Sequence, residues 1–189
     1  MRASSTRADA TAKKLVFEKL LKAEDRPRLV TTLRVTGTIA PDATVYHWHI
    51  ELCLAPTEDG SESNDASRTV VFDMTPTGPG EAGILIVKSN SDSSTSFVPS
   101  DQFELDIQVK ERHTVQEYLN FFVNKGMQRY KFDDTGSGCY HWVVTVLAHL
   151  ESNGWIPQGS LSDLEAFRAE QRKLRPDNIP TPYPKGQFY

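Results

Sequence analysis

The chain has 189 residues, of which 38% are hydrophobic and 24% are charged, as is usual for a globular domain with its own core. The net charge of −4 argues against general nucleic-acid binding, which needs a basic surface. No apolar run is long enough to span a membrane, so we expect no membrane-spanning segment.

The first residues are polar, with no apolar segment behind them that would indicate a signal peptide. We therefore expect a cytoplasmic protein in which both cysteines, Cys53 and Cys139, are reduced thiols. Residues 1–12 are expected to be disordered, and Lys13–Lys22 is expected to form a short helix because its apolar residues recur at a spacing of four.

The first half of the chain is rich in strand signals. Alternating or continuous apolar residues separated by turn residues predict strands at 29–36, 45–54, 68–74, 83–88 and 103–109. Polar loops are expected at Thr57–Ser67 and Ser89–Ser96.

The second half is predicted to be helical. Thr114 and Glu117 form a capping box at the start of one helix, and Gly126 ends it. Two more helices follow, one beginning at Cys139 and the last beginning near a second capping box at Ser162 and Glu165. Because strands and helices are segregated, the fold class is α+β, with helices packed on an antiparallel sheet. We expect one domain over 13–175 and an extended, proline-rich tail over 176–189.

A glycine-rich turn leads directly into the helix that begins at Cys139. This cysteine shares a face with a stripe of apolar residues, Trp142, Val143, Val146, Leu147 and Leu150. The unpaired N–H groups and the positive dipole end of a helix N-terminus favour a thiolate, and they can also receive an oxyanion. The alternative is that Cys139 is an inert buried cysteine, since cysteines on apolar faces often are.

The strand over 45–54 has one apolar face and one polar face. His47 and His49 lie on the polar face, and histidine is the side chain that titrates near neutral pH. Asp73 lies within the otherwise apolar strand 68–74, where a carboxylate needs a partner. We therefore predict that Asp73 bonds to His47 or His49, and that His47 reaches Cys139.

Cysteine and histidine could instead bind zinc. The candidate ligands would be Cys139, His141, His47 and His49, but Cys-x-His matches no usual zinc spacing. We expect neither a metal nor another cofactor.

A histidine strand, a second strand bearing a polar residue and a late Gly-x-Gly-Cys helix resemble the circularly permuted members of the papain-like NlpC/P60 superfamily, such as the lecithin–retinol acyltransferase-like and PPPDE-type groups. The resemblance implies a permuted papain-like arrangement with Cys139 as the nucleophile, His47 as its base and Asp73 as the orienting group. His49 would be a second candidate base or orienting group. Tyr140, Trp142 and Trp48 would line the substrate site.

A second resemblance covers nearly the whole chain. The segments His47-Trp48, Val71-Phe72-Asp73-Met74, Tyr130-Lys131-Phe132, Gly138-Cys139-Tyr140-His141-Trp142 and Lys185-Gly186-Gln187-Phe188-Tyr189 resemble an uncharacterised family of proteins from filamentous fungi. It implies one compact domain and an intracellular fungal source, but no activity.

The sequence therefore favours cysteine-dependent acyl-enzyme chemistry, as in an amidase, a peptidase or an acyltransferase. The substrate would be a small molecule or a peptide, and a role in fungal specialised metabolism is consistent with this. The alternative is a non-catalytic binding protein on the same fold, with Cys139 as a core residue. The oligomeric state is not indicated.

Overall fold

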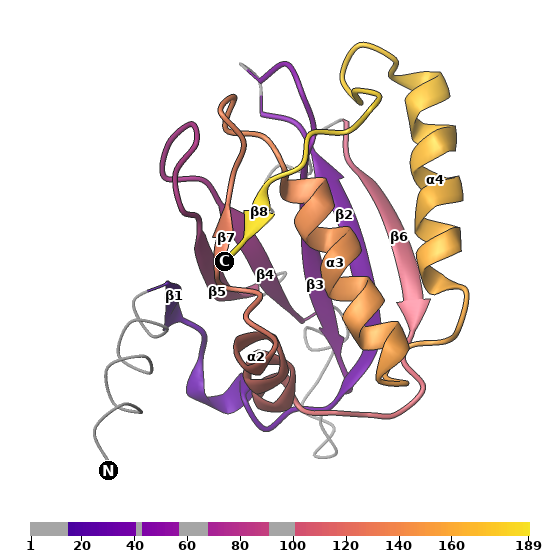
Figure 1. Cartoon of the computed structure of the whole chain (residues 1–189). Helices are drawn as coiled ribbons and strands as arrows, with labels where there is room; N and C mark the ends of the chain where they lie inside the picture. Colours follow the sequence, from indigo (N-terminus) through magenta and orange to yellow (C-terminus); the bar gives the residue numbers. More distant parts are fainter. Residues whose placement is uncertain (1–14, 41–42, 57–67, 91–100) are drawn as a thin grey trace.

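The computed structural model describes residues 15–40, 43–56, 68–90 and 101–189, and the expected disorder of residues 1–12 lies outside them. The described residues form an α+β fold of one six-stranded sheet with helices packed on it (Figure 1). Its strands are β1 (Val16–Leu20), β2 (Val30–Thr38), β3 (His47–Leu54), β4 (Thr69–Thr75), β5 (Ile84–Asn90) and β6 (Phe103–Gln108). A short 3-10 helix, η1 (Ala23–Asp25), follows β1.

The sheet is mixed rather than wholly antiparallel. Its order is β1-β5-β4-β3-β2-β6, and every neighbouring pair is antiparallel except β1 and β5. The expected helix over Lys13–Lys22 is therefore wrong, because Val16–Leu20 is the parallel edge strand. Its partner lies about 70 residues later in the chain, where Val16 pairs with Leu85, so pairing across the sheet overrides the helical spacing of a few apolar residues.

Burial along β3 alternates strictly, as the sequence predicts for a strand with one apolar face. The apolar face is buried in the core and includes Trp48, Ile50, Leu52 and Leu54. His47, His49, Glu51 and Cys53 lie on the opposite face and are half-buried. The apolar residues of β3 therefore face the core, and its titratable residues lie on the opposite face of the sheet.

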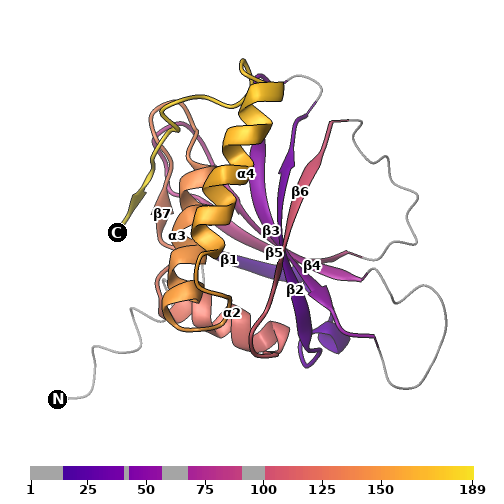
Figure 2. The same ribbon diagram turned by 90° about the vertical axis from the view of Figure 1, so that its right-hand side faces the viewer.

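The helices α2 (Val115–Asn124), α3 (Cys139–Ser152) and α4 (Ser160–Leu174) lie on one side of the sheet (Figures 1 and 2). The predicted capping box of α2 is confirmed, with Thr114 and Glu117 bonding each other's backbone N–H groups. The second predicted capping box is wrong: α4 begins two residues earlier, at Ser160, after Gly159 in a left-handed conformation. Among the described helices, none is long and apolar enough to cross a membrane.

The C-terminal segment returns across the molecule to the start of α3 (Figure 1). Its last residues form β8 (Gln187–Phe188), which pairs with β7 (Tyr130–Lys131) in a small second sheet. Ile179 on the way is buried, and Tyr183 and Phe188 pack against the main core. The segment therefore places aromatic and proline side chains beside the N-terminus of α3.

Candidate active site

Cys139 is the first residue of α3, as the sequence predicts, and it follows the N-cap residue Gly138. Gly138 has a φ of 135°, a conformation that L side chains rarely adopt, and no side chain caps the helix. The first N–H groups of α3 therefore have no side-chain acceptor at the end of the helix that carries the thiol.

The loop before Cys139 is held by one carboxylate. Oδ1 of Asp133 accepts hydrogen bonds from the N–H groups of Thr135 and Ser137 and from the Thr135 hydroxyl. The hydroxyl of Tyr130 donates to the Gly138 carbonyl at 2.8 Å. These contacts fix the backbone that leads into the cysteine.

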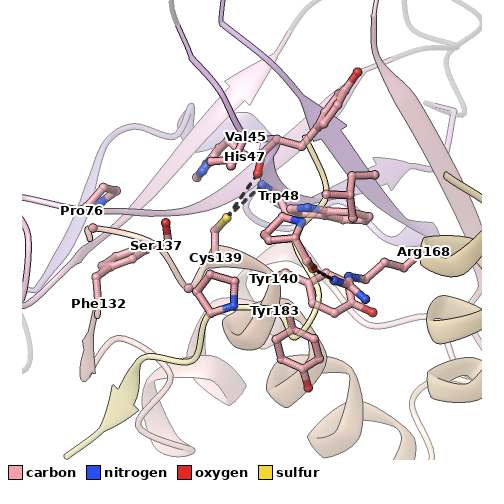
Figure 3. Close-up of a pocket in the computed structure, with 16 residues that line it drawn as sticks. Val45, His47, Trp48, Pro76, Phe132, Ser137, Cys139, Tyr140, Arg168 and Tyr183 are labelled. Atoms are coloured by element: carbon pink, nitrogen blue, oxygen red, sulfur yellow. Dashed lines mark hydrogen bonds between the residues drawn. The ribbon is translucent and has the colours of Figure 1, made fainter. Parts of the chain in front are cut away.

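The sulfur of Cys139 lies against the backbone at the start of β3. Pairing of β3 with β2 continues as far as His47 and Thr38, whereas its pairing with β4 reaches no further than Ile50 and Phe72. Past that point the Trp48 N–H donates to Sγ at 3.4 Å, and Sγ lies 3.9 Å from the Tyr46 carbonyl oxygen (Figure 3). The thiol from the helix layer thus reaches the sheet where β3 and β4 have separated.

His47 joins this cysteine to Asp73. Nε2 of His47 lies 2.6 Å from Oδ1 of Asp73, which comes from the neighbouring strand β4. Because Nε2 is bonded to the carboxylate, Nδ1 is the ring nitrogen left for the thiol. Asp73 and His47 are thus bonded to each other, and His47 and Cys139 line the same pocket.

His47 and Asp73 stabilise each other's charged forms. Burial alone would lower the pKa of His47, but hydrogen bonding to Asp73 and to Cys139 outweighs it and raises this pKa to about 10. Burial likewise raises the pKa of Asp73, yet the bond to His47 brings it below its usual value. At neutral pH the arrangement therefore favours an imidazolium bonded to the Asp73 carboxylate.

His49 is placed differently from the expectation that it could act as a second base. Its Nε2 lies 3.1 Å from Oε1 of Glu51 on the same strand face. Its ring is 6.1 Å from that of His47, centroid to centroid, and it does not line the pocket beside Cys139. His49 and Glu51 thus form a pair of their own on this face of β3.

A pocket of about 110 Å³ opens beside Cys139 (Figure 3). Its walls come from β3, the loop before α3, α4 and the C-terminal segment, and they are mostly apolar or aromatic. The residues that line it include Tyr46, His47, Trp48, Ser137, Cys139, Tyr140, Arg168, Pro180 and Tyr183. Among the described residues, no group of three or more His, Cys, Asp or Glu side chains is arranged to hold a metal ion.

The three predicted substrate-binding residues divide between this pocket and the core. Trp48 and Tyr140 line the pocket, and their rings meet edge to face with centroids 4.8 Å apart. Trp142 does not line it: this residue is fully buried, and its indole N–H donates to the Met127 carbonyl. Trp142 points into the core because it lies on the same helical stripe as Val143 and Val146.

Two residues that were not predicted from the sequence, Arg168 and Tyr183, also line the pocket. A signal for Arg168 was present, because it lies four residues after Leu164 on the buried stripe of the last helix, where a cation is unusual. No sequence pattern indicated that Tyr183 would line the pocket, because its position depends on the path of the C-terminal segment.

The fold and this site define an α+β protein in which a helix-terminal cysteine and a histidine bonded to an aspartate line a pocket with aromatic walls. The chain belongs to the family described as "Domain of unknown function (DUF7770)", whose model matches residues 31–189. This fits the expected membership of an uncharacterised family. No curated protein and no solved structure matches the chain.

Proposed function

We propose that the protein is a thiol enzyme that forms an acyl-enzyme on Cys139, as an amidase, a peptidase or an acyltransferase does. The observation that supports this most is that Cys139 and His47 line one pocket and that His47 is bonded to Asp73. A nucleophile, its base and a group that orients the base are the parts that such chemistry needs.

The first half of the reaction uses the thiolate as nucleophile. His47 holds the proton that the thiol has lost, and Sγ attacks the carbonyl carbon of the substrate, so that a C–S bond forms. The bond from that carbon to the leaving amine or alcohol then breaks, and the leaving group takes the proton from His47. Asp73 stabilises the imidazolium throughout.

The second half regenerates the thiol. His47, now neutral, removes a proton from water or from an acceptor nucleophile as it attacks the thioester carbon. The C–S bond breaks, Sγ leaves as the thiolate, and His47 again carries the proton. Water gives hydrolysis and another nucleophile gives acyl transfer.

The negative oxygen formed in both halves needs donors. The N–H groups at the start of α3 have no side-chain cap, and the helix dipole favours negative charge there. The Ser137 hydroxyl also lines the pocket. We assign the oxyanion to the Cys139 N–H, with Ser137 as the nearby side-chain donor.

The chain order also supports the proposal. His47 and Asp73 precede Cys139, which is the order implied by a circularly permuted papain-like arrangement, and the α+β fold with a helix-terminal cysteine is compatible with it. Both cysteines are free thiols, as the reducing cytoplasm of a fungal cell would keep them. Specialised metabolism is a setting in which such an enzyme would act.

The test is direct detection of the acyl-enzyme. The purified chain is incubated with 4-nitrophenyl acetate and 4-nitrophenyl butyrate, and the intact mass is measured before and after hydroxylamine treatment. We expect one hydroxylamine-sensitive acyl group, located at Cys139 by peptide mapping, and its loss in Cys139→Ala. Cys53→Ala is the matched control and should acylate like the wild type.

Acylation that is equal at both cysteines, or absent from Cys139 in the folded protein, would remove the basis for an enzyme. The second candidate function would then take its place. It is a binding protein that uses the same pocket, and its support is that Sγ already contacts backbone groups of Trp48 and Tyr46, as a packed cysteine would.

A further inference from the structure

Arg168 places a positive charge in the wall of the pocket described above. This side chain comes from α4, is 8% exposed and lies on the opposite side of the pocket from His47 in Figure 3. A guanidinium keeps its charge at any physiological pH, so its burial carries a desolvation cost that a partner must offset.

The protein itself supplies only some of the contacts that would offset this cost. One N–H group, on Nη2, donates to the Pro180 carbonyl, and the guanidinium carbon lies 4.8 Å from the centre of the Tyr140 ring and 5.1 Å from that of Tyr183. The two rings hold the guanidinium in place and stabilise its charge through their π faces. None of these contacts brings a negative charge.

No carboxylate of the described residues forms an ion pair with Arg168, although several other arginines of the molecule have one. Glu165, one turn earlier on α4, is exposed and forms no ion pair with Arg168 among the described residues. The wall of the pocket therefore contains a buried cation with N–H donors beyond the one bonded to Pro180, and a guanidinium presents parallel pairs of N–H groups that match a carboxylate.

We propose that Arg168 binds a carboxylate of the substrate, and that the substrate class is small acyl compounds with a carboxylate separated from the reactive carbonyl by a short apolar body. This rests on the proposed function for the place of the reactive carbonyl at Cys139. The aromatic walls, Trp48 and Tyr140, would contact the apolar body. The volume of about 110 Å³ is smaller than the cavity of about 150 Å³ that holds benzene, so the part of the substrate inside the pocket is small.

The binding test does not depend on catalysis. The wild-type chain is alkylated at Cys139 with iodoacetamide in the presence of increasing pentanoate or of the neutral, equally long pentanamide. We expect pentanoate to protect Cys139 at concentrations about tenfold lower, or more, because a charge-assisted bond to a guanidinium is lost with the amide. Protection must be absent at Cys53, which serves as the internal control.

Variants then assign the preference to Arg168. Arg168→Gln should remove the difference between pentanoate and pentanamide, while Arg168→Lys should keep part of it. Arg172→Gln is the matched control, because it removes the same charge from an exposed position on the same helix. Circular dichroism and thermal unfolding establish that each variant is folded.

Equal protection by pentanoate and pentanamide in the wild type would overturn the proposal, and Arg168 would then serve to hold the Pro180 backbone. An unchanged preference in folded Arg168→Gln would overturn it too. If Arg168→Gln does not fold, the wild-type comparison and Arg168→Lys decide. A carboxylate preference without any acylation of Cys139 would contradict the enzyme but not this site.

Discussion

Nε2 of His47 lies 2.6 Å from Oδ1 of Asp73, and this contact joins two strands at the point where their backbones no longer pair. The ladder between β3 and β4 reaches no further than Ile50 and Phe72, and the side-chain bond continues the connection toward Cys139. A titratable pair therefore joins β3 and β4 beyond the end of their backbone pairing.

The first prediction concerns the charge of His47. Asp73→Asn removes the carboxylate that stabilises the imidazolium, so the pKa of His47 should fall toward the ordinary value of 6.5. NMR titration of the histidine ring protons measures this. Glu51→Gln, which alters the neighbouring pair with His49, should leave the pKa of His47 much less changed, and a fall of equal size would contradict the assignment.

The second prediction is the pH dependence of stability that this pair confers. The pKa of His47 is raised on folding, so its contribution is complete below pH 6.5 and is lost as the pH rises toward about 10. The pKa of Asp73 is lowered on folding, so its contribution is complete above pH 3.8 and is lost as the pH falls below that value.

The measurement is urea unfolding of the wild type and of His47→Ala across this pH range. The difference in the free energy of unfolding should be largest between about pH 4 and 6.5 and should shrink on both sides. A difference that does not vary with pH would mean that His47 contributes by packing alone.

The third prediction compares the two thiols. Burial raises the pKa of Cys53 to about 11, with the nearby Arg34 opposing it, so little thiolate exists there at neutral pH. Iodoacetamide should therefore modify Cys139 about tenfold or more faster than Cys53 near pH 7, because Cys139 lines the pocket and lies at a helix N-terminus. His47→Ala should slow Cys139 and leave Cys53 unchanged, as peptide mapping by mass spectrometry would show; equal rates would favour a packed, inert Cys139.

The fourth prediction concerns the turn before the cysteine. Gly138 has a φ of 135°, and a Cβ there would lie 2.7 Å from the Tyr130 hydroxyl oxygen. Gly138→Ala should lower the free energy of unfolding by about 1–3 kcal/mol and slow alkylation of Cys139, because the helix start must shift. Gly126→Ala is a useful comparison, since its φ is also positive but no atom lies within 4 Å of the added Cβ; it should lower stability without changing the thiol.

The fifth prediction separates Trp142 from the pocket. This side chain is fully buried between α3 and α2, with its ring 6.3 Å from that of Phe122, and its truncation to alanine should cost about 3–5 kcal/mol. Trp142→Phe should keep most of the stability and leave the alkylation rate of Cys139 unchanged in kinetic assays. A large loss of Cys139 reactivity in folded Trp142→Phe would instead show that Trp142 contributes to the site.

Local patterns in the sequence were sufficient for the elements whose structure depends on near neighbours. The alternation along His47–Leu54 predicted the buried and polar faces of β3, since side chains of a strand alternate wherever one face is covered. The capping box at Thr114 and the helix start at Cys139 were predicted for the same reason, because both depend on residues a few positions apart.

Only the tertiary structure decided where distant segments meet. Val16–Leu20 is a strand because β5 is beside it, and Trp142 is a core residue because α2 and Met127 receive its ring. Arg168 lines the pocket because the C-terminal segment brings Pro180 and Tyr183 against α4. The sequence determined which residues could form a site, through local periodicity and side-chain chemistry, whereas long-range pairing and packing decided which of them share one pocket.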